Sequence, residues 1–333
     1  MSTIDNTSSN DISLYDDDTR QFYLIQFWVF LLLIIPSISA SLFALYHLLH
    51  DKNLRKPYHN YVIIILLIIN LFYECTDICI YIHYFRCFES FSSTLSFRLF
   101  WGYIDWGVYA LELILYAWTT IERHILIFHD QLITTRNKRF FIHYFPPIII
   151  FIYCLLYYTI IFFASQCKDS IDDITGPSLF HCAYENNTLY MYEIIVNAIL
   201  PTFIVVGSSI VLLLRVVWQK YHAHRQTHWR QYRKMTFQVL IISCLYLVLP
   251  FPSMFIIFLQ LCGISNDVGA EFLSRMTYAS YYTLLLFPIF SIGSLPELRK
   301  KFLKMIQFRR PPRTIHPTNF PTALKTINRA SIQ

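Results

Sequence analysis

The chain has 333 residues, of which 55% are hydrophobic and only 14% are charged, with a formal net charge of +6. Soluble domains carry roughly 25% charged residues, so the composition excludes an ordinary soluble enzyme, a disordered chain and a small disulfide-rich secreted domain. The length is typical of about two soluble domains, but the composition favours one membrane domain.

Long apolar runs recur along the chain. A bilayer core needs about 20 mostly apolar residues per helix, and only helices or closed barrels satisfy their backbone groups in lipid. The runs lack the alternating polarity of barrel strands. The sequence therefore predicts an all-α membrane protein, a seven-transmembrane helix bundle with spans at Phe22–Leu49, Tyr58–Phe85, Arg98–Phe128, Phe140–Ser165, Tyr190–Trp218, Met235–Cys262 and Phe272–Gly293.

The remaining segments flank this bundle, which we assign to residues 22–294. Residues 1–21 are predicted to form an acidic extracellular tail, and residues 309–333 a disordered cytoplasmic tail. Between the bundle and that second tail, an apolar stripe lies beside four basic residues. This pattern is typical of a short helix in the membrane interface, and it predicts amphipathic helix 8 over residues 295–308, with the stripe formed by Leu298, Phe302, Met305 and Ile306.

Basic residues between the runs set the predicted orientation, because cytoplasmic loops are enriched in Lys and Arg. One set of alternating segments holds 20 basic residues and the other holds 3. This asymmetry predicts a multi-pass protein of the cell membrane with its N-terminus outside. The basic inner face suits anionic membrane lipids, and topology alone explains its charge, so we expect no nucleic-acid partner.

Two glycosylation sequons agree with this orientation. Asn6 and Asn186 are each followed, two residues later, by Ser or Thr, and both lie in predicted outer segments. We expect both asparagines to carry glycans.

The third run carries a polar stripe at helical spacing. Its members recur every three or four residues, so they share one face of a helix, which must point into the bundle or a wet cavity because polar groups are costly in lipid. Contact between helices is an alternative role for the stripe. It consists of Asp105, Tyr109, Glu112, Tyr116, Thr119 and Arg123.

At the inner end of this stripe, Glu122-Arg123-His124 resembles the Asp/Glu-Arg-Tyr motif of rhodopsin-like (family A) G-protein-coupled receptors. Pro250 and Pro288 stand where that family has its helix-6 and helix-7 prolines. The resemblance covers nearly the whole chain and identifies it as a divergent member. It implies a receptor, not an enzyme, that binds an extracellular ligand, activates a heterotrimeric G protein through these five residues, and needs no cofactor or metal.

Several family positions are replaced. Asn70 stands where the family has a helix-2 Asp, and Glu112 stands where it has a helix-3 Ser. We therefore interpret Asn70 and Glu112 as an ion-site-like pair in which the carboxylate has moved to helix 3. In the family the acid of the motif holds the Arg, which gives Glu122 the role of holding Arg123.

Four cysteines lie in or beside predicted outer segments. The family bridge joins helix 3 to the second outer loop, but its helix-3 position is Arg98 here. Cys182 is therefore predicted to pair with Cys167 or with Cys87, with a slight preference for Cys167, or to stay free.

The resemblance also implies a ligand pocket. An Asp at the offset of Asp105 binds the ammonium of amine ligands in this family, and a helix-7 Tyr at the offset of Tyr281 supports it. With Tyr109 between them, and with Glu193 and Asn197 on helix 5, the site would suit a cationic amine or a basic peptide. Alternatively, Asp105 and Tyr281 bond each other and hold helices 3 and 7 together.

A seven-helix transporter or channel without G-protein coupling is the alternative function. Such a protein needs ionisable residues that continue across the membrane on several helices. The sequence places acids within several runs but does not arrange them in a recognisable ring. No His-rich box or paired His–acid motif indicates a catalytic or metal site.

Overall fold

The computed structural model describes residues 6–51, 59–87, 94–128, 136–164, 182–222, 240–276 and 278–307. Within these ranges the protein is helical and contains no strand. The first four predicted runs fold into α1 (Asn6–His50), α3 (His59–Tyr73), η1 (Glu74–Ile78), α4 (Cys79–Arg86), α5 (Leu95–Phe128), α6 (Arg136–His143), α7 (Phe145–Thr159) and η4 (Ile160–Ala164).

The later runs also fold into helices. They form η5 (Cys182–Glu185), α8 (Asn187–Tyr192), η6 (Glu193–Ile199), α9 (Leu200–His222), α11 (Pro250–Leu261), α12 (Ala270–Arg275), α13 (Ala279–Ser294) and α14 (Pro296–Gln307). The prediction of an all-α membrane-type chain is thereby confirmed for the described residues.

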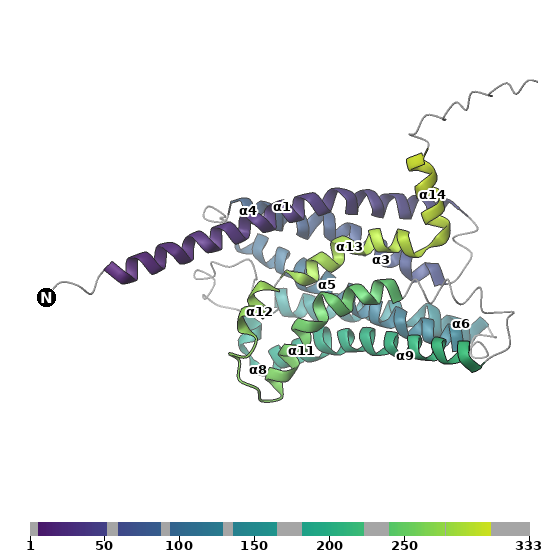
Figure 1. Cartoon of the computed structure of the whole chain (residues 1–333). Helices are drawn as coiled ribbons and strands as arrows, with labels where there is room; N and C mark the ends of the chain where they lie inside the picture. Colours follow the sequence, from purple (N-terminus) through teal and green to yellow (C-terminus); the bar gives the residue numbers. More distant parts are fainter. Residues whose placement is uncertain are drawn as a thin grey trace, which may run out of the picture.

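The helices form an elongated bundle (Figure 1). α1 packs against α13, α3 and α4, and α5 packs against α3, α7 and α9. One end of the bundle carries α4, α8 and α12, and the other carries α6 and α14. We refer to these as the α12 end and the α14 end. α1 begins at Asn6, so helix extends through most of the predicted acidic tail and projects past the α12 end.

The described residues support four to six membrane spans, so the predicted count of seven is not confirmed. Among the described residues, four helical stretches are long and apolar enough to cross a bilayer: Arg20–His50, Tyr61–Arg86, Phe140–Ala164 and Asn187–Arg215. Two bent pairs raise the count to six if each pair is one span. The first joins Leu240–Val248 to α11 at 51°, and the second joins α13 to residues 296–305 of α14 at 94°.

α5, which covers the third predicted span, does not meet these criteria of composition, and its packing shows how the bundle accommodates it. The polar stripe of the third run faces the bundle, as predicted: Asp105, Glu112 and Arg123 are buried. Because α3, α7 and α9 surround it, α5 can carry charged groups that a lipid-facing helix could not.

π-helical turns interrupt two of the apolar stretches. η1 joins α3 to α4, and η6 joins α8 to α9 just before Pro201. Single π turns within α-helices are frequent at functional sites. Here they carry buried polar residues: Glu74 and Asp77 lie on η1, and Glu193 and Asn197 lie on η6.

The prolines act differently at their two predicted positions. The helix breaks immediately before Pro250, where the 51° bend occurs, as expected for a residue that lacks an N–H donor and clashes with the preceding turn. Pro288 lies inside α13, which continues through it.

α14 corresponds to the predicted helix 8. It turns sharply away from α13 (Figure 1). Leu298 is fully buried, and the ring of Phe302 packs on that of Phe43 with centroids 5.5 Å apart. Lys301 Nζ lies 2.7 Å from Asp51 Oδ2 at the end of α1. These contacts fasten α14 to the bundle.

The orientation of the bundle is a prediction for experiment. We expect an epitope tag at the N-terminus to be stained on intact cells, because the basic residues concentrate on the opposite side. Tags within residues 223–239 and after Gln333 should be stained only after permeabilisation. Surface staining of both chain ends would contradict an odd number of spans.

Candidate functional site

The carboxyl group of Asp105 on α5 is the centre of a buried cluster near the α12 end. Tyr281 on α13 donates a hydrogen bond to Oδ1 at 2.7 Å, and Tyr73 donates to the same oxygen at 3.0 Å. Tyr81 donates to Oδ2 at 3.1 Å and itself accepts a bond from Tyr281 at 2.7 Å. Three helical stretches thus converge on one carboxyl group that is 8% exposed.

A second buried acid, Asp77 on η1, adjoins this cluster. Trp101 donates from Nε1 to Asp77 Oδ1 at 2.8 Å. Tyr73 is within hydrogen-bonding range of Asp77 as well as Asp105, and the two carboxyls interact electrostatically. We call Asp77, Asp105, Tyr73, Tyr81 and Tyr281 the two-acid cluster. Tyr109 lies one turn along α5 and bonds Ser280, the residue before Tyr281.

Asn70 on α3 and Glu112 on α5, the predicted ion-site-like pair, do not bond each other directly. Asn70 donates to Glu74 Oε1 at 2.7 Å, and Ser37 on α1 bonds the same oxygen. Ser41 lies 3.5 Å from Glu74 Oε2. Glu112 is buried, interacts electrostatically with Glu74, and has no hydrogen-bond partner for either oxygen within the described residues. Glu74 is therefore the acid that Asn70 contacts.

Glu193 and Asn197 lie in a separate cluster between α7 and η6. Tyr158 donates to Glu193 Oε1 at 2.5 Å, and Asn197 donates to Oε2 at 2.9 Å. Tyr153 in turn donates to Asn197 Oδ1 at 2.8 Å. These bonds join the fourth and fifth apolar runs. The contacts of Asp105 involve other helices, so the structure does not bring Glu193 and Asn197 to Asp105.

The Glu122-Arg123-His124 segment lies toward the α14 end, and both Glu122 and Arg123 are 1% exposed. Glu122 Oε1 contacts Nδ1 of His143, the last residue of α6. Glu122 thus contacts a residue outside the motif, in addition to the Glu122–Arg123 pairing that the sequence predicts. Arg123 also lines a cavity of about 10 Å³, enough for about one water molecule. His124 is half-buried.

Above Arg123 on the same face of α5, Tyr116 stacks on Tyr246 with ring centroids 4.6 Å apart and planes 7° apart. Tyr116 lies 3.4 Å from the hydroxyl of Ser243, which accepts a 2.6 Å bond from Ser209 on α9. These contacts link α5 and α9 to the helical segment Leu240–Val248, which precedes the bend at Pro250.

The predicted disulfide and glycan sites stay predictions. Cys167 and the side chains of Cys182 and Asn6 lie outside the described residues. Cys87 Sγ lies 4.0 Å from Nδ1 of His83. Asn186 is exposed and serves as N-cap of α8, where its Oδ1 accepts a 3.0 Å bond from Thr188 N.

Sequence reasoning placed Asp105, Tyr109 and Tyr281 in one site, and the structure joins Tyr281 to Asp105. It did not assign Asp77, Glu74, Tyr73 or Tyr81 to a site. A usable signal existed for Glu74, which follows Asn70 by four residues and so shares its helix face. Trp101, which donates to Asp77, lies on α5, and no local spacing reveals this contact.

Comparisons with known proteins do not assign the chain to a family. No protein-family model matches the sequence, and no curated protein matches it. Function must therefore be inferred from the arrangement of side chains.

The Glu193 cluster generates a prediction about stability. Tyr158→Phe removes the hydroxyl that bonds a buried carboxyl, and hydrogen bonds to charged groups contribute about 1.5–3 kcal/mol. We expect a lower melting temperature in detergent. Tyr103→Phe is the matched control, because Tyr103 packs at the edge of the core without a hydrogen bond to a carboxyl. Equal melting temperatures for both variants would contradict a stabilising role for the hydrogen bond between Tyr158 on α7 and Glu193 on η6.

Proposed function

We propose that this chain is a seven-helix receptor that binds a cationic extracellular ligand at the two-acid cluster and activates a heterotrimeric G protein. The observation that carries the proposal is the set of partners of Asp77 and Asp105. Every hydrogen bond that the described residues give these carboxyls comes from a neutral tyrosine or tryptophan. A cationic ligand supplies the opposite charge that two neighbouring carboxylates require.

The position of the cluster supports the same proposal. Asp105 lies eighteen residues before Arg123 on α5, which is about 27 Å along a helix. A ligand at Asp105 and a partner at Arg123 would therefore act near opposite ends of one buried helix. The contacts of Tyr116 with Tyr246 and Ser243 connect that helix to the bent segment before Pro250.

The resemblance to rhodopsin-like receptors supplies the remaining part of the proposal. In that family the motif Arg meets the G protein after helix 6 moves outward, which gives Arg123 the coupling role. Pro250 adjoins the 51° bend and provides the hinge for that movement. Glu122 and His143 hold the inner ends of α5 and α6 together.

A transporter or channel without G-protein coupling is the second candidate. Four buried acids favour it, because Glu74 and Asp77 on η1 face α5, which carries Asp105 and Glu112. Chains of intramembrane carboxyls are typical of proton and ion pathways. Ion flux through liposomes that contain the purified chain, abolished by Glu112→Gln, would favour this function over the receptor.

The ligand assignment predicts the effect of Asp105→Asn. A screen of polyamines and Lys- or Arg-rich peptides, read through a promiscuous G protein, provides the agonist. The variant keeps the shape and one acceptor but loses the charge, so it loses a charge-assisted bond of about 1.5–3 kcal/mol, which is more than tenfold in potency. Asp267→Asn is the control, because Asp267 is an exposed acid outside the cluster. Unchanged potency together with reduced expression would make Asp105 a structural residue.

The coupling assignment predicts that Arg123→Ala abolishes agonist signalling while surface expression is largely kept. Arg275→Ala is the matched control, since Arg275 is an exposed residue paired with Glu271 on α12. Signalling and surface staining are measured on the same cells. Full signalling by a well-expressed Arg123→Ala variant would remove the proposed role of the Glu122-Arg123-His124 segment.

A further inference from the structure

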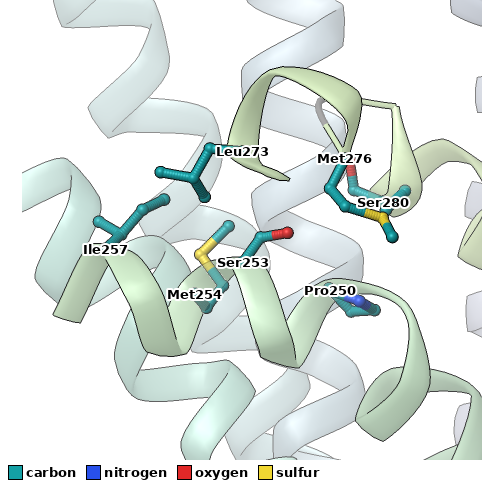
Figure 2. Close-up of a pocket in the computed structure, with 8 residues that line it drawn as sticks. Pro250, Ser253, Met254, Ile257, Leu273, Met276 and Ser280 are labelled. Carbon is teal, nitrogen blue, oxygen red and sulfur yellow. The ribbon is translucent and has the colours of Figure 1, made fainter. Parts of the chain in front are cut away.

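A cavity of about 220 Å³ lies between α11, α12 and α13, apart from the two-acid cluster. Figure 2 shows side chains from all three helical segments directed toward this common space. Its volume is just below the roughly 300 Å³ at which pockets for drug-sized ligands begin. Among the described residues it is lined by Pro250, Ser253, Met254, Ile257, Leu273, Met276, Ala279 and Ser280.

The helical spacing of α11 assigns this cavity to one of its faces. Pro250, Ser253, Met254 and Ile257 follow the three- and four-residue steps of a helix face. An adjacent side of α11 is already packed: Phe251, Phe255 and Phe258 surround Phe203 of α9, with ring centroids 5.4 to 6.4 Å from it. Packing against α9 therefore leaves the cavity face of α11 directed toward α13.

The segment that leads into α12 is fixed to α11, so the cavity has a defined wall. Gln260 Nε2 donates to the carbonyl oxygens of Asn266 at 3.2 Å and Val268 at 3.1 Å. Gly269 has φ +81°, and a Cβ there would lie 3.0 Å from Ile256 Cγ2. Glycine permits both the left-handed backbone and this close approach. The cavity is therefore held open by the fold itself.

One polar atom in the wall has no hydrogen-bond partner among the described residues. Ser253 is 8% exposed, and its Oγ makes no hydrogen bond. Figure 2 shows this hydroxyl directed into the space between α11 and α12. Ser280 differs, since it bonds Tyr109. A buried hydroxyl without a partner costs about 1–3 kcal/mol, so an occupant that bonds Ser253 gains affinity from a group the fold leaves unsatisfied.

We propose that this cavity binds a small neutral amphiphile, with an apolar body and a single hydroxyl or carbonyl that bonds Ser253. The described lining contains no ionisable side chain, which disfavours an ion or a zwitterion. The thioethers of Met254 and Met276 adapt to irregular apolar shapes. This site is distinct from the cationic site at Asp105 and does not depend on the receptor function.

The location gives such an occupant a means to act on the bundle. It would contact Pro250 at the 51° bend and also α13, which carries Tyr281. The occupant would therefore stabilise one relative arrangement of α11 and α13. Binding and its structural effect can be measured without any signalling assay.

The test uses the full chain in liposomes with a diazirine-bearing octanol as the photoreactive probe. After irradiation, adducts are mapped by mass spectrometry, with excess octanol as competitor. We expect saturable, competed labelling of the α11 and α12–α13 peptides. Ser253→Ala should raise the probe concentration that gives half-maximal labelling about twofold to tenfold, as expected for the loss of one neutral hydrogen bond. Met276→Trp should abolish this labelling by filling the cavity.

Ser39→Ala is the matched control, because Ser39 is exposed on α1 and far from the cavity in sequence and contacts. It should leave labelling unchanged. Uniform, non-saturable labelling of lipid-facing helices would overturn the site. If the Ser253→Ala variant is labelled in the cavity as strongly as the unchanged protein, the proposed bond to Ser253 is wrong. This variant decides the question even if Met276→Trp fails to fold.

Discussion

A carboxyl group enclosed in a helical membrane bundle must find hydrogen-bond donors inside the protein, because neither lipid nor apolar side chains can supply them. Among the described residues, four such groups receive hydrogen bonds from other helices, and Trp101 of α5 is the donor to one of them, Asp77. Ser37 of α1 donates a hydrogen bond to Glu74 on η1, and Tyr158 of α7 donates one to Glu193. Asp105 accepts hydrogen bonds from tyrosines on α3, α4 and α13. The positions of the helices follow from these demands as much as from apolar packing.

α5 shows how this constraint connects structure to function. Its polar stripe would be costly in lipid, and it is tolerated because neighbouring helices cover it. Asp105 lies near the beginning of α5, toward the α12 end, and Arg123 lies near its end, toward the α14 end. A charge bound at one end can therefore change the packing of a helix that extends to the other. This arrangement supports the proposed receptor, and the acids along its length are what the transporter alternative would use.

The bend at Pro250 creates a different kind of site. α11, the half of the sixth run that follows the bend, packs its phenylalanines on Phe203. Another face of α11 meets α12 and α13 across the cavity. The proposed cation site and the proposed apolar site thus lie in separate regions, with Tyr109 and Ser280 in hydrogen-bonding range between them. Each site can be tested without the other.

The sequence by itself determined the helical class, the seven apolar runs, the inward face of α5, the break at Pro250 and the amphipathic α14, because each depends on residue periodicity or on proline within one segment. Tertiary structure decided which polar groups meet. Nothing local indicates that Trp101 bonds Asp77, that His143 contacts Glu122, or that Glu193 lies with α7 instead of Asp105. Two π turns shift the residues that follow them to a new face, and the choice of partner then depends on how separate helices pack, which a one-dimensional spacing does not contain.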